Sequence, residues 1–425
     1  MRIGFYIEDS GYSSIHLENP EKGNPGVGGT WYEFALVANS LAQRKEDCDV
    51  YLFHYNSNFY PNICNIIEID GIEDLFVQCE REKIDILIYK TDKKEDWYSC
   101  LNSHKIKCVA WAHTFVGYRE REQIENSPRV VRMVCVGREH YDNYIDEDII
   151  RKSTYIYNMV CKTDQLCRRK CETHDVTYIG SIIPAKSFHK LAKAWKHVIE
   201  HVPDAKLNVI GSGSLYNRNS KLGEYGIAES NYEKKFIKYL LDKDGSVMES
   251  VHFWGVLGEK KTDLILNSAV GVVNPTTKSE TFCISAVEFE QYGVPVCSGR
   301  KNGLLDTVIH KKTGLLSLTT YELACNIIRL LTDEELNECY GKQAHAYAKT
   351  FSPENLTEQW MQCIKDACEE KSATYIKPEG NWLYNGKALR LIVRFIRFDL
   401  GVKKFPSCGN MIYTFKSLVK KIVHK

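Results

Sequence analysis

No long apolar run occurs in this sequence. None of the hydrophobic stretches among its 425 residues approaches the roughly 18 residues that a membrane-spanning helix needs. The opening segment RIGFYIE is typical of a strand and lacks a small-residue cleavage site, so we predict no signal peptide. Because the composition, 44% hydrophobic and 26% charged, is that of an ordinary globular protein, we expect this protein to work in the cytoplasm.

Two motifs that would direct the chain to a metal or a dinucleotide are incomplete. The 16 cysteines include no Cys-x-x-Cys pair, and the cluster of Cys161, Cys167, Cys171 and His174 favours a solvated linker over a zinc site. The segment VIGSGSLY follows a predicted strand, but Tyr216 stands where the dinucleotide fingerprint has its third glycine. We therefore expect neither a bound metal nor a nicotinamide cofactor.

An even spread of charge is missing as well, because the basic residues are concentrated at one end. Residues 371–425 contain 12 Lys and Arg against two Asp and Glu, a net charge of +10. Residues 1–370 contain 44 against 53, a net charge of −9. An acidic main body argues against nucleic acid as its partner, whereas the basic end is typical of a segment that meets an anionic surface.

The basic end also has the periodicity of amphipathic helices. In NGKALRLIVRFIRFDL the basic residues that share one helical face are Lys387, Arg390, Arg394 and Arg397. In FKSLVKKIVHK the apolar residues that share one face are Phe415, Leu418, Val419 and Ile422. Basic amphipathic segments lie on anionic bilayers, so we predict that this tail contacts an anionic membrane surface. The alternative is that the tail helices pack on the body of the protein.

The rest of the chain alternates between short apolar runs and helical segments, and the pattern starts afresh in the second half. Such β-α repetition predicts parallel sheets covered by helices, and a chain of this length should form two or three domains of roughly 150 residues. We predict two doubly wound Rossmann-like domains, joined near residues 160–175 and facing each other across a cleft. The predicted segments are a first domain (1–165), a second domain (166–352), a helix crossing both (353–370) and the basic tail (371–425).

The stretch KSETFCISAVEFEQYGVPV combines an acidic loop with an acidic helix face. It follows the apolar run AVGVVN, and we predict a helix from Cys283 to Tyr292 that Gly293 ends. Glu280 should then lie just before the helix and Glu288 on its face. A polar loop between a buried strand and a helix is where open α/β sheets bind ligands, although a solvated acidic face would explain the same residues.

Three further positions could contribute chemistry. Gly28 and Gly29 precede Thr30, which with Glu33 has the pattern of a capping box; glycines before a helix let an anion approach, but they can also be a simple turn. His113 ends the apolar run KCVAWAH at the functional edge of a parallel sheet, where it is either a site residue or a structural one. The loop after VTYIG places Lys186 at a similar edge, where a plain surface lysine is the alternative.

In this order, the motifs resemble the family-4 glycosyltransferases of GT-B fold. The resemblance extends over about residues 2–365 and combines GGTWYEF, the strand-end His113, Lys186 six residues past Gly180, KLNVIGSG, VHFWG and the acidic stretch. Its most specific part is Glu280 followed, after seven residues, by Glu288. Members of this family transfer a sugar from a nucleotide donor with retention at the anomeric carbon, usually without a metal. Many bacterial members build capsule, lipopolysaccharide or exopolysaccharide on lipid-linked acceptors.

The resemblance implies separate roles for the charged residues. Glu288 would accept hydrogen bonds from the donor's ribose, and Glu280 would hold hydroxyls of the transferred sugar. Lys186 would face the leaving diphosphate, and His113, from the opposite domain, would contact the donor sugar. Five residues along a helix rise about 7.5 Å, so one helix could hold phosphate at its start and ribose at Glu288.

Other residues are expected to bind the donor through the backbone. The N–H groups of the helix start would face the diphosphate, the glycine turn would admit the donor phosphates or the acceptor, and a loop near residues 256–257 would meet the base. These residues are Cys283, Ile284, Ser285, Gly28, Gly29, Val256 and Leu257. Two departures from the family pattern stand out: Ser181 replaces a common arginine of the phosphate clamp, and Cys283 replaces a common glycine.

We therefore expect a retaining, metal-independent hexosyltransferase without a cofactor, whose substrate is a nucleotide-sugar such as a UDP- or GDP-sugar. Its acceptor would be a glycan or a lipid-linked glycan in polysaccharide biosynthesis, and the protein would be peripheral on the inner face of the cell membrane. The alternatives are a catalytically weak nucleotide-sugar-binding subunit, a GT-B sugar-nucleotide epimerase and a polymerising synthase.

Overall fold

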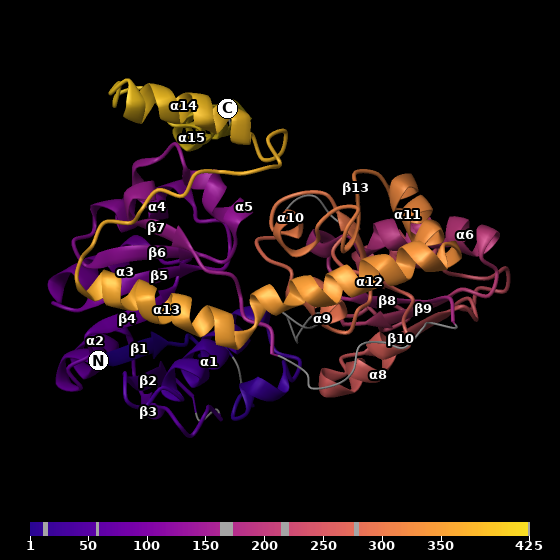
Figure 1. Ribbon diagram of the computed structural model, residues 1–425, viewed down its shortest axis with the longest axis horizontal. Coiled ribbons are helices and arrows are strands. Elements are labelled where there is room, and N and C mark those ends of the chain that lie inside the picture. Colours follow the sequence, from indigo (N-terminus) through magenta and orange to yellow (C-terminus); the bar gives the residue numbers. More distant parts are fainter. Residues whose placement is uncertain (12–15, 57–58, 162–172, 214–220, 276–279, 424–425) are drawn as a thin grey trace. The chain divides into compact units, whose positions relative to one another are not determined.

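The chain forms two compact units, each built on one parallel sheet (Figure 1). The first unit comprises residues 1–18, 34–158 and 356–425, and the second comprises 19–33 and 159–355. The two doubly wound domains that the sequence predicts are thus confirmed as separate units, while their predicted boundaries stay predictions. The computed structural model describes residues 1–11, 16–56, 59–161, 173–213, 221–275 and 280–423.

The sheet of the first unit has seven strands in the order β3-β2-β1-β4-β5-β6-β7, all parallel. The central strands are short apolar runs, because strands covered by helices on both faces must be apolar almost throughout. In β5, for example, every side chain from Cys108 to Ala112 is fully buried. The strands are β1 (Arg2–Tyr6), β2 (Asp49–His54), β3 (Asn65–Glu68), β4 (Ile86–Lys90), β5 (Lys107–Ala112), β6 (Val130–Cys135) and β7 (Ser153–Tyr155).

Helices connect the strands of the first unit. Their apolar residues, such as Leu75 and Phe76 of α2 and Trp97 and Leu101 of α3, are buried. Trp97 stacks on the ring of Tyr6 from β1, with ring centroids 5.2 Å apart. The helices are α1 (Gly29–Ala42, in this unit from Phe34), α2 (Ile72–Arg81), α3 (Glu95–Ser103), α4 (Tyr118–Asn126), α5 (Arg138–Tyr141) and α13 (Pro353–Cys368, in this unit from Leu356).

The sheet of the second unit has six parallel strands in the order β10-β9-β8-β11-β12-β13. The order reverses between β8 and β11, and this switch point is where open α/β sheets bind ligands. The strands are β8 (Asp175–Ile179), β9 (Lys206–Ile210), β10 (Val251–Gly255), β11 (Val270–Val272), β12 (Val296–Gly299) and β13 (Gly314–Ser317).

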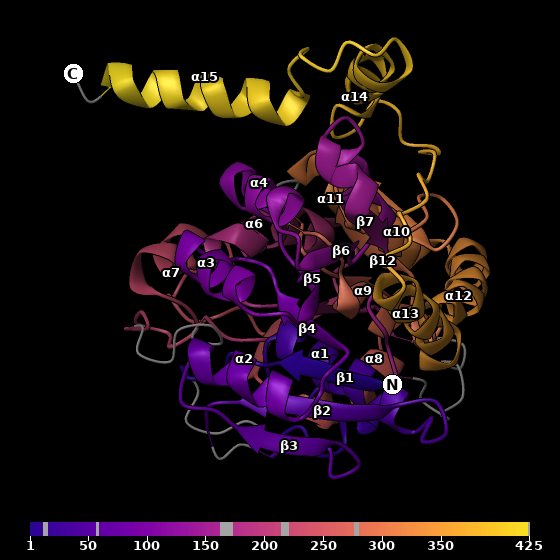
Figure 2. The same ribbon diagram turned by 90° about the vertical axis from the view of Figure 1, so that its left-hand side faces the viewer.

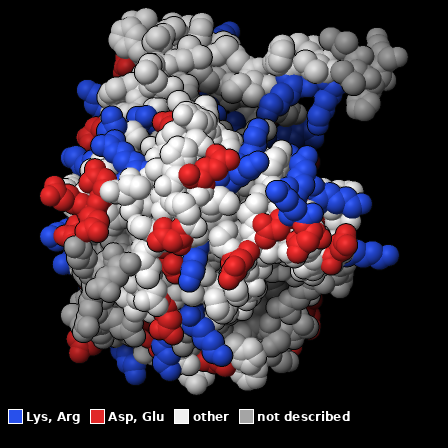
Figure 3. Space-filling view, turned by 90° about the vertical axis from the view of Figure 1, so that its right-hand side faces the viewer, with Lys and Arg blue, Asp and Glu red and all other residues white. Residues whose placement is uncertain are grey.

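The helices of the second unit bury an apolar core that includes Trp195 of α6 and Ile327 of α11. Over the face of the molecule in Figure 3, Lys and Arg are intermingled with Asp and Glu, in accord with the formal net charge of +1. The helices are α6 (Phe188–His201), α7 (Ser230–Ile237), α8 (Lys261–Leu266), α9 (Ile284–Gln291), α10 (Leu304–Thr307), α11 (Thr320–Thr332) and α12 (Glu334–Ala348).

The tail belongs to the first unit and contains α14 (Lys387–Arg394), a π-helical turn (Phe395–Asp399) and α15 (Cys408–Val423) (Figure 2). The predicted basic face of α14 exists, but it packs on the first unit instead of facing outward: Lys387 is fully buried, and Arg390 and Arg397 are each 9% exposed. The basic side chains turn inward because they form ion pairs with carboxylates of the first unit. None of the described helices has the length and apolarity that crossing a bilayer requires.

Candidate functional site

A pocket lies in the second unit at the switch point of its sheet. Its walls come from segment 24–29, the loops that follow β8, β9 and β10, the end of β11 and the start of α9. Ile179 and Gly180 line it at the end of β8, and Asn274 lines it beyond β11. The pocket therefore occupies the sheet edge where the sequence predicts a ligand site.

Backbone forms much of the wall beside β8 and β9, because side chains do not fit there. Gly211 has φ of +139°, and a Cβ atom at this position would lie 2.0 Å from the carbonyl oxygen of Gly180. Only glycine tolerates both conditions. The two loops thus expose main chain to the pocket, which lets a ligand approach the backbone closely.

The acidic loop before α9 places Glu280 against Lys186. The Lys186 ammonium, at the end of a 3₁₀ turn (Pro184–Lys186), donates to Glu280 Oε2 at 2.5 Å, and the Asn274 side chain donates to the same oxygen. The Glu280 main-chain carbonyl accepts the Gly303 N–H at 2.9 Å, which fixes the loop. Both charged groups line the pocket and keep some exposure, 24% for the lysine side chain and 11% for the carboxylate.

Helix α9 begins at Ile284 and presents its first turn to the pocket. Cys283 is the N-cap residue and makes no side-chain capping hydrogen bond, while Cys283, Ile284 and Ser285 all line the pocket. First-turn N–H groups have no acceptor within a helix and favour anions. On its other face α9 packs against the sheet, where the Phe289 ring leaves no room for a side chain at Gly271 of β11. The helix start is therefore both rigid and able to bind an anion.

A second ion pair lies one turn further along α9. The Lys261 ammonium, from the first residue of α8, donates to Glu288 Oε1 at 2.6 Å. Their side chains are 17% and 14% exposed, and both line the main pocket. They also line a smaller neighbouring hollow with Tyr32 and Gln291. The site thus has two lysine–carboxylate pairs, one before α9 and one on its face.

Cys283 is inert in this setting. Burial raises the pKa of its thiol well above the usual range, and the negative charge of Glu280 raises it further. The thiol therefore stays protonated at neutral pH and is no nucleophile. Its neighbour in the pocket, Ser181, is only 3% exposed.

His113 follows β5 in the first unit. It is 8% exposed and packs between Trp111 and Phe34, with ring centroids 4.4 and 5.7 Å away. Burial, together with the positive charge of Lys90, lowers the pKa of His113 well below its usual range. Its imidazole is therefore neutral at physiological pH and offers hydrogen bonds without a charge. Its contact with a ligand of the second unit stays a prediction.

The predicted capping box before the first long helix is wrong. Helix α1 already includes Gly29 and Thr30, so Thr30 is not its N-cap. The Glu33 carboxylate accepts the N–H of Met159 at 2.9 Å and so is committed to another segment. The turn is instead fixed by Asn24, whose Oδ1 accepts the N–H groups of Gly26 and Val27, each at 2.9 Å.

Most of the predicted site residues meet in one pocket. Two do not line it: His113, in the first unit, and Gly28, which precedes α1. Of the cysteine cluster, Cys167 and Cys171 lie outside the described residues, and Cys161 is buried beside the Tyr32 hydroxyl rather than solvated. The predicted residues that line the pocket are Glu280, Lys186, Glu288, Cys283, Ile284, Ser285, Gly29, Ser181, Val256 and Leu257.

The residues of the pocket that were not predicted include Lys261, Asn274 and Asn24. The turn signal Asn-Pro-Gly could have indicated Asn24, and Asn274 stands directly after an apolar strand. Lys261 carries no local signal, because it is one of two adjacent lysines at the start of a short helix. Only the fold shows that it meets Glu288.

Comparison with known proteins shows similarity to glycosyltransferases. Residues 169–347 match the family model of glycosyl transferases group 1, and this range includes both ion pairs. Similar curated proteins are an uncharacterized glycosyltransferase of Methanocaldococcus jannaschii (25% identical over 238 residues, 55% of this chain and 57% of the relative) and a D-inositol 3-phosphate glycosyltransferase of Corynebacterium glutamicum (27% over 198 residues, 46% and 44%). Another is a capsular polysaccharide biosynthesis glycosyltransferase of Staphylococcus aureus (25% over 187 residues, 43% and 44%). The chain spans about half the length of these relatives.

Solved structures confirm the fold. Sucrose-phosphate synthase from Thermosynechococcus elongatus superimposes with a TM-score of 0.65 at 15% identity, covering 86% of this chain and 98% of the synthase. HepE of Anabaena, in complex with UDP and glucose, gives 0.60 at 13% identity, covering 86% and 100%. With its two parallel-stranded Rossmann-like sheets, the chain has the GT-B fold that the sequence predicts.

Proposed function

We propose that this protein is a retaining glycosyltransferase that moves a hexose from a nucleotide-sugar donor to a glycan or lipid-linked glycan acceptor. One observation carries the proposal: the pocket at the sheet's switch point joins a helix start to two lysine–carboxylate pairs, Lys186–Glu280 and Lys261–Glu288. A nucleotide-sugar has an anionic diphosphate flanked by hydroxyl-rich ribose and sugar. The pocket offers a helix start and lysines for the diphosphate, Glu288 for the ribose and Glu280 for the sugar.

The diphosphate would lie at the start of α9. The N–H groups of its first turn would donate to phosphate oxygens, and the Lys186 ammonium would add a positive charge beside them. As the sugar–phosphate bond breaks, negative charge grows on the leaving diphosphate, so these donors stabilise the transition state more than the ground state. Donor phosphate would compete with Glu280 for Lys186 and release the carboxylate toward the sugar hydroxyls.

The ribose would lie beside Glu288, whose carboxylate accepts hydrogen bonds from its hydroxyl groups. Lys261, now paired with Glu288 at 2.6 Å, would supply the second positive charge that the family commonly places at the position of Ser181. A lysine from α8 would thus replace an arginine from the loop after β8. Backbone near Val256 and Leu257 would face the base, and Gly29 would let the donor or the acceptor approach.

His113 would contact the transferred sugar from the first unit as a neutral hydrogen-bonding group. Its lowered pKa fits this role, since a charged imidazolium would compete with the lysines for phosphate. We further propose that transfer needs neither a metal nor another cofactor, because the helix start and two lysines balance the charge of the diphosphate. Activity in the presence of a chelator tests that part.

The acceptor and the place of action complete the proposal. The match to a capsular polysaccharide biosynthesis glycosyltransferase supports a role in building polysaccharide. The complex of HepE with UDP and glucose supports a nucleotide-sugar donor, for which we keep a UDP- or GDP-sugar as the proposal. We place the protein in the cytoplasm at the inner face of the cell membrane, where lipid-linked acceptors lie and where the tail would meet an anionic membrane surface.

Incubation with a panel of nucleotide-sugars tests the activity. Purified protein should release free nucleotide from one donor, and Glu288→Ala should reduce the rate at least tenfold because the ribose loses its acceptor. Glu335→Ala, an exposed glutamate on α12 of the same unit, is the matched control and should keep full activity. Product analysis by NMR should show retention at the anomeric carbon. Inversion would contradict the mechanism.

A second candidate, a nucleotide-sugar-binding subunit without catalysis, is favoured by Ser181 and Cys283, which depart from the family pattern. The same panel separates the two. A pure binder would be stabilised by a nucleotide-sugar in a thermal-shift assay but would release no nucleotide from any donor.

A further inference from the structure

The tail turns its basic side chains toward the protein. The Lys387 ammonium, fully buried, lies 2.8 Å from Glu139 Oε1 and 2.7 Å from Asp142 Oδ2. One turn further along α14, the Arg390 guanidinium lies 2.7 Å from Asp146 Oδ1. All three carboxylates belong to the segment between β6 and β7 of the first unit. The net positive charge of the tail is therefore partly used within the molecule.

The next two arginines continue this inward row. Arg394 stacks on the Tyr375 ring, 3.4 Å from its centroid, and donates to the Ile145 carbonyl oxygen at 3.0 Å. Arg397 pairs with Asp148 and donates to the Phe405 carbonyl oxygen at 2.6 Å. The row fixes the rotation of α14 about its own axis. It leaves the opposite side of the helix facing solvent.

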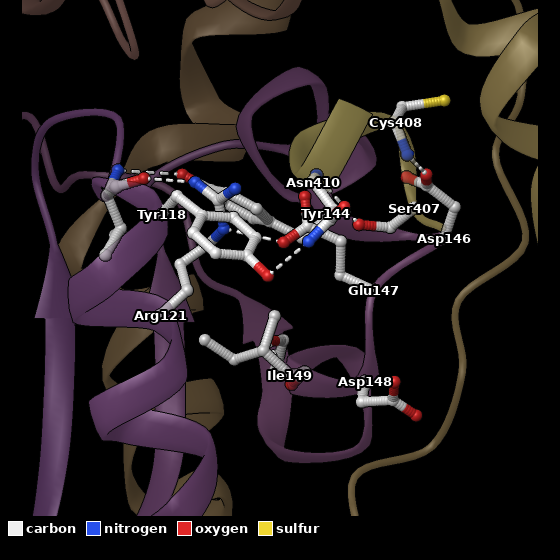
Figure 4. A network of polar contacts seen from close by, with 12 residues as sticks. Tyr118, Arg121, Tyr144, Asp146, Glu147, Asp148, Ile149, Ser407, Cys408 and Asn410 are labelled. Carbon is white, nitrogen blue, oxygen red and sulfur yellow. Dashed lines mark hydrogen bonds and ion pairs between the residues drawn. The ribbon is translucent and has the colours of Figure 1, made fainter. Parts of the chain in front are cut away.

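The start of α15 is held by the same acidic segment (Figure 4). Asp146 Oδ2 accepts the N–H of Cys408 at 2.6 Å, and the Asn410 side chain donates to the Tyr118 hydroxyl at 2.8 Å. Tyr413, one turn later, stacks on Tyr118 with ring centroids 4.7 Å apart. Beyond it the helix extends away from the other helices of the first unit (Figure 2).

Apolar side chains cover the side of the tail that faces away from these contacts. On α14 and its continuation, Leu389, Ile392 and Phe395 recur at helical spacing and are each at least half exposed; on α15, Phe415 is 67% exposed. Exposed apolar groups of this density mark an interaction site in a soluble domain. We call this set the outer tail face; its members are Trp382, Leu383, Leu389, Ile392, Phe395, Leu400, Val402, Met411, Ile412, Phe415, Leu418 and Val419.

We propose that the outer tail face docks on an anionic lipid bilayer by inserting its apolar side chains at the level of the headgroups. Charge identifies this occupant. The sequence from residue 400 to 425 contains six lysines and no Asp or Glu. Lys416, Lys420 and Lys421 are exposed on α15, beside the apolar face rather than on it. A helix with exposed apolar residues and lysines binds the interface of anionic membranes, each lysine adding to the attraction.

Two other arguments support a bilayer over a second copy of this chain. Pairing two copies through the same face would bring their lysines together with no acidic residues of this segment to balance them. In addition, an isolated helix of the length of α15 is only marginally stable in water, whereas an apolar surface along one side stabilises it. This inference deepens the proposed membrane contact and rests on it for the location, but not on sugar transfer.

Vesicle flotation with the full-length protein tests the docking. Wild-type protein should bind vesicles of phosphatidylcholine with one quarter phosphatidylglycerol, and the double variant Phe395→Glu, Phe415→Glu should bind at least tenfold more weakly. Val77→Glu is the matched control, because Val77 of α2 is 48% exposed in the same unit but outside the tail; it should bind as wild type. Replacing Lys416, Lys420 and Lys421 by glutamine should reduce binding to the level seen with pure phosphatidylcholine.

Binding of the double variant equal to wild type, or no binding of wild type to anionic vesicles, would overturn the docking. Light scattering covers the alternative occupant: a dimer that the double variant dissociates would assign the face to a second copy and refute the proposal. Equal unfolding midpoints of wild type and variant show that the comparison is made between folded proteins. Because nucleotide release is measured without vesicles, a failure of docking and a failure of the proposed activity are distinguished.

Discussion

Two sets of lysine–carboxylate pairs in this molecule have the same chemistry but different surroundings. In the second unit, Lys186–Glu280 and Lys261–Glu288 face a pocket and keep between 11% and 24% of their side chains exposed. In the first unit, Lys387 lies between Glu139 and Asp142, and all three side chains are at most 2% exposed. A pair beside open space can exchange its partner for a ligand, whereas an enclosed pair can only hold its two segments together.

Charge alone does not identify a functional site in this protein. Both sets would look alike in a list of ion pairs. The two sets differ in their surroundings. The pocket pairs lie beside a helix start and exposed backbone, whereas the pairs of Lys387 are completely enclosed. We therefore expect changes in the pocket pairs of the second unit to alter ligand binding with little effect on stability. Changes in the buried pairs of Lys387 should lower stability with little effect on ligand binding.

Lys387→Ala should have the largest effect on stability. It leaves Glu139 and Asp142 buried without their ammonium partner, and removing one member of a buried pair costs about 3–5 kcal/mol. Chemical denaturation should show this loss, together with faster proteolysis of the tail. Lys342→Ala is the control: its pair with Glu338 is exposed, so the unfolding midpoint should hardly change. Adding Glu139→Gln and Asp142→Asn to Lys387→Ala should restore part of the loss; no recovery would argue that packing, not charge, holds the tail.

Lys261→Ala should have a smaller effect, confined to the pocket. If Lys261 supplies the second positive charge for the diphosphate, its loss should weaken nucleoside diphosphate binding roughly tenfold, the effect of one charge-assisted hydrogen bond. Stability should change little. The neighbouring Lys260 is exposed and does not line the pocket, so Lys260→Ala should bind as wild type. Equal affinities of the two variants would remove Lys261 from the site.

A further effect should appear in the pH dependence of the stability of the first unit. Burial lowers the pKa of His140 to about 3, whereas an unfolded histidine titrates near 6.5. Between these values the unfolded state binds a proton that the native state does not, so stability is complete above about pH 6.5 and declines as the pH falls toward 3. Denaturation at pH 7, 6 and 5 should show this decline, and His140→Gln should flatten it by up to about 1.4 kcal/mol per pH unit. An unchanged slope would mean that other groups dominate.

Much of the fold could be predicted from the sequence, because it rests on local patterns. Short apolar runs such as residues 107–112 favour strands covered on both faces. The helix of Glu288 was predicted to within one residue at each end: it runs from Ile284 to Gln291 and is followed by Gly293 with φ of +73°. Thr30 shows the limit, because a capping pattern is short and Glu33 instead binds the N–H of Met159, more than 100 residues away.

The site and the tail show what local patterns leave open. Periodicity places Lys387, Arg390, Arg394 and Arg397 on one face, but it does not say which way that face points. The direction of this face depends on Asp146, whose carboxylate binds the Arg390 side chain and the backbone N–H of Cys408. Asp146 is far from both residues in the chain. Lys261 was missed for the same reason. Its meeting with Glu288 depends on how α8 and α9 pack.

Our central claim is that the two lysine–carboxylate pairs of the pocket exchange their partners for a nucleoside diphosphate. Calorimetric titration of UDP and GDP into wild type and Lys186→Ala tests it most directly. We expect one of the two nucleotides to bind wild type, and Lys186→Ala, with an unchanged unfolding midpoint, to bind it at least tenfold more weakly. Absence of binding by wild type, or equal affinity of the two proteins, would contradict the account.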